Sequence, residues 1–92
     1  MRNIEKISKL INSIKNKEEI EKFFFEIFTE NELKTLSKRW RIMELLAQNV
    51  TQREIAQELN VSLCKVTRGA KILKNKHAIT TRFLTGENNN GK

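Results

Sequence analysis

The amino-acid sequence predicts an all-α fold, and three observations lead to that prediction. The 92 residues include no proline and only three glycines, so few positions interrupt a helix. Apolar side chains recur at intervals of three and four residues, which is the spacing of one helix face. Hydroxyl side chains that can cap a first helical turn precede several of these segments, at Thr29, Thr51 and Ser62. The pattern predicts about six helices in one small domain.

Residues 3–14 and 18–28 are predicted to form the first two helices, separated by a polar break that begins at Asn16. The second helix is expected to turn five side chains inward, those of Ile20, Phe23, Phe24, Ile27 and Phe28. Phe25 lies off this face and is expected to meet a partner. Because each apolar face is narrow and a short chain buries little surface by itself, we expect residues 1–46 to build a dimer interface as well.

The third helix has the clearest start in the sequence, because Thr29 and Glu32 can form a capping box. Its apolar stripe is expected to consist of Leu33, Leu36, Trp40, Met43 and Leu46. This near-heptad spacing is that of a long helix packed against other helices, so Trp40 is expected in the core. The helix is predicted to end between Ala47 and Asn49.

Residues 50–74 are predicted to form two short helices joined by a tight turn. Thr51 and Glu54 can form a capping box at the start of the first of these helices, residues 52–59. Asn60 follows, and asparagine tolerates the left-handed conformation that such a turn often needs. A helix, a short turn and a second helix form the helix-turn-helix pattern, whose second helix lies in a DNA major groove.

The second helix of the pair, residues 63–74, has Ser62 as its N-cap and combines an apolar stripe with a polar and basic outer arc. The buried stripe is expected to consist of Leu63, Val66, Ala70 and Leu73. The outer arc is expected to consist of Cys64, Lys65, Thr67, Arg68, Lys71 and Lys74. A further short helix over residues 77–84 is expected to bury Ile79 and Phe83.

We therefore expect one domain, residues 1–84, and a disordered tail, residues 85–92, that has no apolar side chain. The expected division of the domain is dimerisation helices over residues 1–49, the helix-turn-helix over 50–74 and a short C-terminal helix over 77–84.

The formal net charge of the chain is +7, and the distribution of this charge is uneven. Residues 1–51 carry ten basic and eight acidic side chains, whereas residues 52–82 carry seven basic and two acidic ones. No acidic residue lies between Glu58 and Glu87. A run of charge is usually a solvated face, but here the basic excess coincides with the helix-turn-helix, which favours a surface that contacts phosphates.

Other functional classes find little support in the sequence. No Ser-His-acid set or glycine-rich phosphate loop is present, and His77 stands alone without any aspartate, so neither an enzyme nor a metal site is expected. No apolar run is long enough to cross a membrane, and the start of the chain lacks the apolar core of a signal peptide. A single cysteine, Cys64, excludes an intrachain disulfide and suits a cytoplasmic protein.

Three stretches resemble the Trp repressor family. They are FTENELKTLSKRWRI (28–42), TQREIAQEL (51–59) and the triplet Thr67-Arg68-Gly69. The resemblance spans about residues 15–84, and the combination of TQRE and TRG after a capped, arginine-bearing helix is fairly specific. It implies an intertwined all-α homodimer that represses transcription at palindromic operators when L-tryptophan is bound as co-repressor.

The resemblance also implies site residues. Arg39 and Arg68 match the two arginines that sandwich the indole ring, and Thr29 matches a residue supplied by the other subunit. Gly69 matches a small residue that leaves room for the ligand, although a glycine in mid-helix can equally serve close helix packing. The residues expected at DNA are Gln52, Arg53, Cys64, Lys65, Thr67, Lys71 and Lys74.

Three alternatives remain open. Ile72 stands where the family is expected to have a pocket serine, and the link before the motif is one residue shorter than in the best-known tryptophan-dependent members. A DNA-binding regulator without a small-molecule gate is therefore the second reading. A helical protein-interaction module that uses the phenylalanine-rich second helix is the third. An RNA-binding protein is the fourth, disfavoured because the basic face has no aromatic side chains on which bases could stack.

Overall fold

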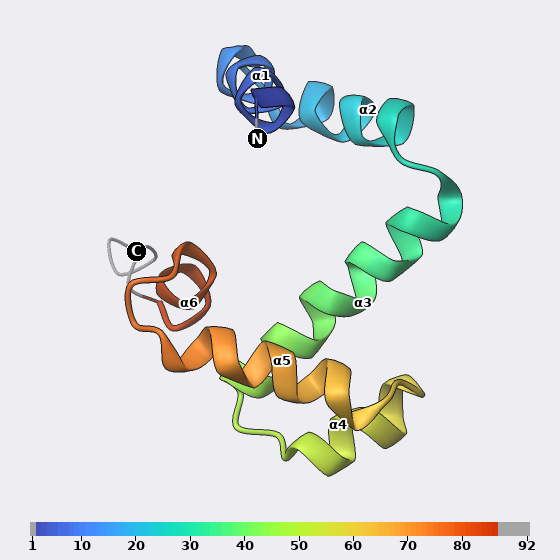
Figure 1. The fold of residues 1–92 in the computed structure, drawn as a ribbon, viewed down its shortest axis with the longest axis vertical. Helices are drawn as coiled ribbons and strands as arrows, with labels where there is room; N and C mark the ends of the chain where they lie inside the picture. The colour runs from blue at the N-terminus through green and yellow to red at the C-terminus, as the bar shows by residue number, and fades with distance from the viewer. Residues whose placement is uncertain (1, 87–92) are drawn as a thin grey trace. The chain divides into compact units, whose positions relative to one another are not determined.

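The computed structural model describes residues 2–86, and these residues fold into six α-helices (Figure 1). The helices are α1 (Arg2–Ser13), α2 (Lys17–Ile27), α3 (Glu30–Ala47), α4 (Gln52–Leu59), α5 (Leu63–Lys74) and α6 (Ile79–Leu84). The described residues contain no strand, and the prediction of an all-α fold is confirmed. Helices α4 and α5 have the predicted bounds, whereas α6 begins two residues later than predicted. Residues 87–92 of the expected tail lie outside the described residues.

The predicted capping boxes form at the start of α3 and of α4. Thr29 Oγ1 accepts a hydrogen bond of 3.1 Å from the Glu32 amide, and the Glu32 carboxylate accepts one of 2.8 Å from the Thr29 amide. Thr51 and Glu54 repeat this reciprocal pair at 3.2 and 3.3 Å. Each cap satisfies amide groups that a first helical turn leaves without partners, a contribution of about 1 kcal/mol. Local pairs of this kind decide where α3 and α4 begin.

The chain divides into two compact units, of which the first comprises Met1–Lys34. Neither α1 nor α2 contains a buried residue. Phe25 is 72% exposed, and Ile27, which was predicted to point inward, is 50% exposed. The prediction for Ile27 is wrong because two short helices of one chain provide too few neighbours to cover their apolar faces. The aromatic rings that pack on one another in this unit are those of Phe23, Phe24 and Phe28.

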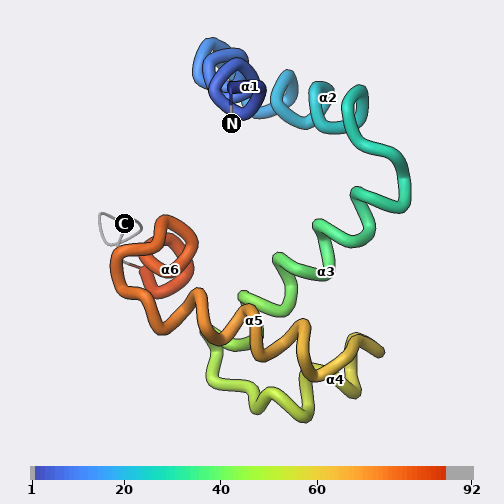
Figure 2. The backbone as a smooth tube through the Cα atoms, in the orientation of Figure 1, coloured from blue at the N-terminus to red at the C-terminus, as the bar shows by residue number. Residues whose placement is uncertain are grey.

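The second unit, Thr35–Lys92, has its core where the second half of α3 meets α4 and α5. The core cluster consists of Ile42, Leu45, Ile55 and Val66. Around it pack the partly buried side chains of Leu46, Val50, Ala56, Leu59 and Val61. Since Ile55 and Val66 are fully buried, this cluster holds α4 and α5 in one arrangement. The backbone through α4, the turn and α5 can be followed in Figure 2.

The environment of α6 and Trp40 differs from the prediction. Trp40 is 41% exposed rather than buried in the core, and the centroid of its ring lies 5.9 Å from the ring centroid of Phe83. Phe83 is itself 45% exposed and Ile79 is 74% exposed, so α6 does not bury them. The buried residue of α6 is Thr81, whose hydroxyl donates a 3.0 Å hydrogen bond to the Ile72 carbonyl. Residues two positions away from Thr81 lie on the opposite side of a helix that turns every 3.6 residues.

Candidate nucleic-acid interface

The turn between α4 and α5 is short and closely defined. Asn60 adopts the left-handed conformation that the sequence predicts, with φ 54° and ψ 51°. The Val61 amide donates a 3.1 Å hydrogen bond back to the Ala56 carbonyl. Ser62 then caps α5, since its Oγ accepts a 3.4 Å hydrogen bond from the Lys65 amide. The second helix therefore starts directly after the turn, and the shared core fixes it against α4.

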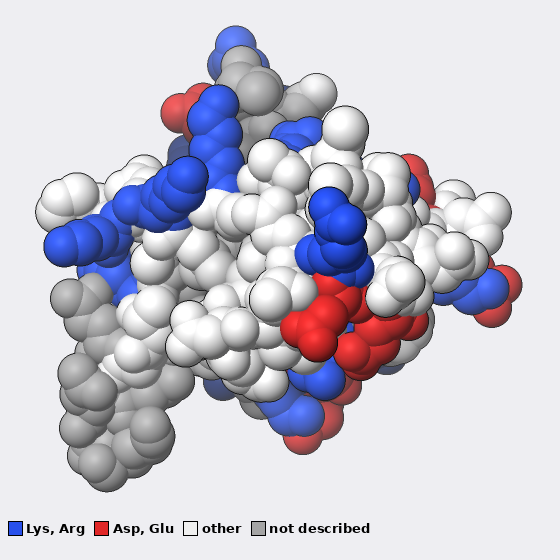
Figure 3. Space-filling view, turned by 90° about the horizontal axis from the view of Figure 1, so that it is seen from below, with Lys and Arg blue, Asp and Glu red and all other residues white. Residues whose placement is uncertain are grey.

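The outward side of α4 and α5 carries the side chains that were predicted to contact DNA. Gln52 is half-buried, and the other predicted residues are exposed: Arg53, Cys64, Lys65, Thr67, Lys71 and Lys74. Within the described residues, no basic side chain of α4 or α5 forms an ion pair, because the ion pairs lie in α2 and α3. Figure 3 shows Lys and Arg side chains standing out from a broad uncharged surface, with a group of acidic side chains beside one of them near the centre of this face. Positive charge without an internal partner is available to phosphate groups.

One hydrogen bond joins two of the predicted contact residues. The Thr67 hydroxyl donates to Gln52 Oε1 at 3.0 Å, across 15 positions of the sequence. Because the carbonyl oxygen of the Gln52 amide is held in this way, its NH₂ group remains as a donor to an external acceptor. Sequence reasoning placed both residues at DNA without pairing them, and no local pattern could have done so.

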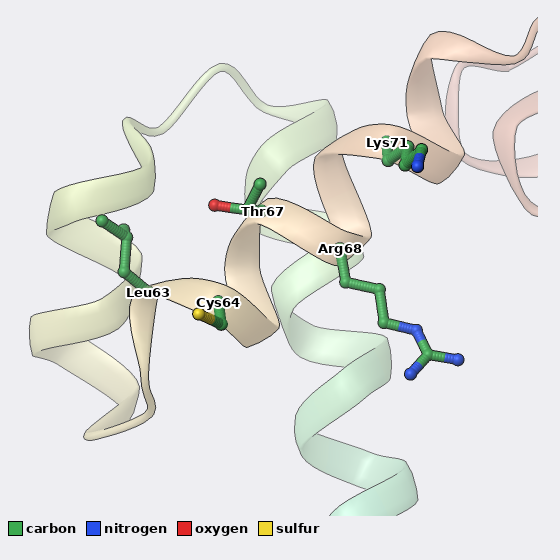
Figure 4. Close-up of a pocket in the computed structure, with 5 residues that line it drawn as sticks. All are labelled: Leu63, Cys64, Thr67, Arg68 and Lys71. Atoms are coloured by element: carbon green, nitrogen blue, oxygen red, sulfur yellow. The ribbon is translucent and has the colours of Figure 1, made fainter.

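A shallow open hollow of about 410 Å³ lies along the outer side of α5. Its lining residues are Leu63, Cys64, Thr67, Arg68 and Lys71, which follow one another along the helix in Figure 4. Four of them belong to the predicted outer arc. Leu63 does not, because it was predicted to be buried, and the structure leaves it 49% exposed. Leu63 is the first residue of α5, directly after the cap residue Ser62, whereas Val66, three positions later, reaches the core. The position of Leu63 directly after the cap was the feature of the sequence that could have indicated its exposure.

The residues expected to hold an amino-acid ligand have different environments. Arg39 on α3 and Arg68 on α5 are exposed members of the second unit. Thr29 is an exposed residue of the first unit and serves as the cap of α3. Gly69 is buried where α5 packs closely on α3. A methyl group added to Gly69 would lie 3.1 Å from a methyl carbon of Ile42.

Two short helices around a left-handed turn define the class of helix-turn-helix proteins. In the described part of the chain, the basic side chains of the second helix form no ion pair. The family model of the Trp repressor protein matches residues 2–87. The chain belongs to the Trp repressor family, whose proteins are DNA-binding transcription regulators and not enzymes. The family fold implies an intertwined dimer.

Individual relatives agree with this assignment. The Trp operon repressor homolog of Chlamydia caviae is 40% identical over 75 residues, which are 80% of this chain and 71% of that protein. The homolog of Xylella fastidiosa is 46% identical over 52 residues, 55% of this chain and 56% of its own. The homolog of Vibrio parahaemolyticus is 34% identical over 76 residues, with 82% and 74% covered. No solved structure gives a significant match.

Among the described residues, no helix is long and apolar enough to cross a membrane.

Proposed function

We propose that this chain is a transcriptional repressor that binds a palindromic DNA operator as a homodimer. The observation that carries the proposal is the outer side of α5, where basic side chains have no acidic partner within the described residues. Two such helices, one from each protomer, enter successive major grooves about 34–36 Å apart. Phosphate contacts fix the position of the protein on the duplex, and contacts to base edges distinguish one sequence from another.

In this proposal, different side chains on the outer side of α4 and α5 contact different groups of the DNA. Lys71, Lys74 and Lys76 contact phosphates, together with the amide groups at the start of α5. Arg53 and Lys65 lie on the outer sides of α4 and α5, and their side chains donate to base edges directly or through water. The Gln52 amide, oriented by Thr67, donates to a phosphate oxygen. None of these contacts requires a catalytic group.

The dimer explains the apolar side chains that one chain leaves uncovered. Large apolar residues are exposed in both units: Ile4, Leu10, Phe25, Ile27, Leu36 and Trp40. Exposed apolar surface on this scale marks an interaction site in a small protein. The second copy of the chain is the partner that the family fold implies, so we assign these residues to the contact between protomers.

L-tryptophan is the co-repressor in this proposal. A guanidinium group stacks well on the electron-rich face of an indole ring, and a second guanidinium can hold the ligand's carboxylate. Arg39 and Arg68 supply these groups, both exposed, and Thr29 reaches the ligand from the other protomer. Because Gly69 already packs closely on α3, a ligand beside Arg68 would act by changing the angle of α5 against α3.

The competing function is DNA binding without a small-molecule gate. Its supporting observation is Ile72, which is 41% exposed and offers no polar group where the family is expected to place a serine. Titration calorimetry of the protein with L-tryptophan, followed by operator binding with and without the ligand, distinguishes the two functions. One ligand bound per chain and tighter operator binding support the gated repressor. Absence of heat at millimolar ligand with intact operator binding supports the ungated regulator.

DNA binding itself is tested by selecting sites from random duplexes and titrating the best site at several salt concentrations. A palindromic consensus and an affinity that falls steeply with salt are expected, since each phosphate contact releases counterions. A protein-interaction module would select no consensus and show no salt-dependent affinity for duplex DNA.

A further inference from the structure

The first turn of α5 presents an apolar surface at the position where a groove-binding helix meets base edges. Leu63 is 49% exposed although it is a large apolar residue, and Cys64 beside it is exposed. Both line the hollow of about 410 Å³, which continues along α5 to Lys71 (Figure 4). In a helix-turn-helix the N-terminal residues of the second helix are those that reach the bases. The first two residues of this helix therefore present apolar or weakly polar side chains, and the first strongly polar one is that of Lys65.

Thr67 adds to the apolar character of the hollow. Its hydroxyl proton is engaged by Gln52 Oε1 at 3.0 Å, which leaves the methyl group as a contact surface. The cysteine thiol beside it is only a weak donor. The middle of the hollow thus offers no strong hydrogen-bond donor to a base, and Thr67 Oγ1 remains there only as an acceptor.

The charges around the hollow favour a nucleic acid as its occupant. Arg68 and Lys71 complete the lining, and Lys65 and Lys74 are exposed on the same helix. No acidic residue lies between Glu58 and Glu87. A second copy of this surface would bring like charges together, whereas a DNA backbone complements them.

Among the four bases, thymine is the one that presents a methyl group, at C5, in the major groove of DNA. We propose that the hollow formed by Leu63, Cys64 and Thr67 receives thymine methyl groups, so that each operator half-site carries thymine opposite the start of α5. This inference rests on the proposed function, because it requires α5 in the major groove. It makes Leu63 a specificity-determining residue and adds an apolar contact to the polar set predicted from the sequence.

The test uses the full chain and the best duplex obtained by selection. Each thymine in a half-site is replaced in turn by deoxyuridine, which removes the methyl group and leaves the base pairing unchanged. At one or two positions the dissociation constant should rise about fourfold, the effect of one buried methyl group. Uniform insensitivity to deoxyuridine, with specific binding retained, would overturn the inference and leave the proposed function intact. Failure to select any site would instead count against the proposed function.

Two variants of Leu63 test whether the loss of affinity for deoxyuridine duplexes arises at the hollow. Leu63→Ala should reduce the ratio of the thymine and deoxyuridine dissociation constants to near one, whereas Leu63→Met should retain most of it. Lys74→Ala is the matched control, because it should weaken binding to both duplexes equally. If this ratio in the Leu63→Ala protein equals that of the wild type, the assignment of the thymine contact to the hollow is wrong. Dissociation of the dimer by Leu63→Ala would also overturn the assignment, since that result would place the hollow between protomers.

Discussion

Gly69→Ala probes the contact that positions α5. The added methyl group would lie 3.1 Å from Ile42 Cγ2, 3.1 Å from Met43 Sδ and 3.2 Å from Leu46 Cδ1. Favourable contacts between carbon atoms lie at about 3.5–4.0 Å, so all three neighbours must move or α5 must move away from α3. All three are side-chain atoms, of which the methyl group of β-branched Ile42 has the least freedom to move.

Two effects of opposite sign decide how much Gly69→Ala changes the free energy of unfolding. Replacing glycine by alanine in a helix interior stabilises the helix by about 1 kcal/mol. Forcing an extra methyl group into a packed core destabilises the protein by about 1–3 kcal/mol. The expected net effect of Gly69→Ala is therefore a loss of about 0–2 kcal/mol, or up to roughly 10 °C in Tm for a chain of this size. Operator affinity should fall as well, because α5 changes its position on α3.

Thermal unfolding at fixed protein concentration measures the stability, and fluorescence anisotropy with a labelled duplex measures the affinity. The double variant Gly69→Ala/Met43→Ala removes the sulfur atom that meets the new methyl group. It should be more stable than the sum of the two single effects predicts. A Gly69→Ala protein that is more stable than wild type by about 1 kcal/mol and binds the operator equally well would refute the packing argument.

Three other changes test the remaining parts of the proposal. Lys74→Ala should weaken binding to every DNA sequence and lower the slope of log affinity against log salt by about one, since one phosphate contact is lost; an unchanged slope would remove Lys74 from the interface. Arg68→Ala should abolish any calorimetric response to L-tryptophan while circular dichroism shows the helices intact, and persistent co-repression would exclude the arginine sandwich. Phe25→Ala should shift sedimentation equilibrium toward the monomer, because Phe25 is 72% exposed in the single chain. A dimer as stable as the wild type would place Phe25 outside the interface.

The helices and their caps could be predicted from the sequence because the interactions that define them are local. Thr29 with Glu32, and Thr51 with Glu54, are three positions apart, and Asn60 occupies the turn that its own backbone preference suits. The same local rules gave α4 and α5 their correct bounds. The basic outer side of α5 was likewise readable, because a helix places residues three and four positions apart on one face.

The sequence by itself thus determined the helices, the helix-turn-helix, the excess of positive charge on it and the family. Only the tertiary structure decided that Gly69 lies in close contact with α3, that Thr67 holds the Gln52 amide, and that Leu63 faces outward. These contacts join residues 15 or more positions apart, or depend on how far one helix rotates against another. A periodic pattern gives the face of a helix but neither its rotation nor its neighbours, because both follow from side chains that interlock across the core.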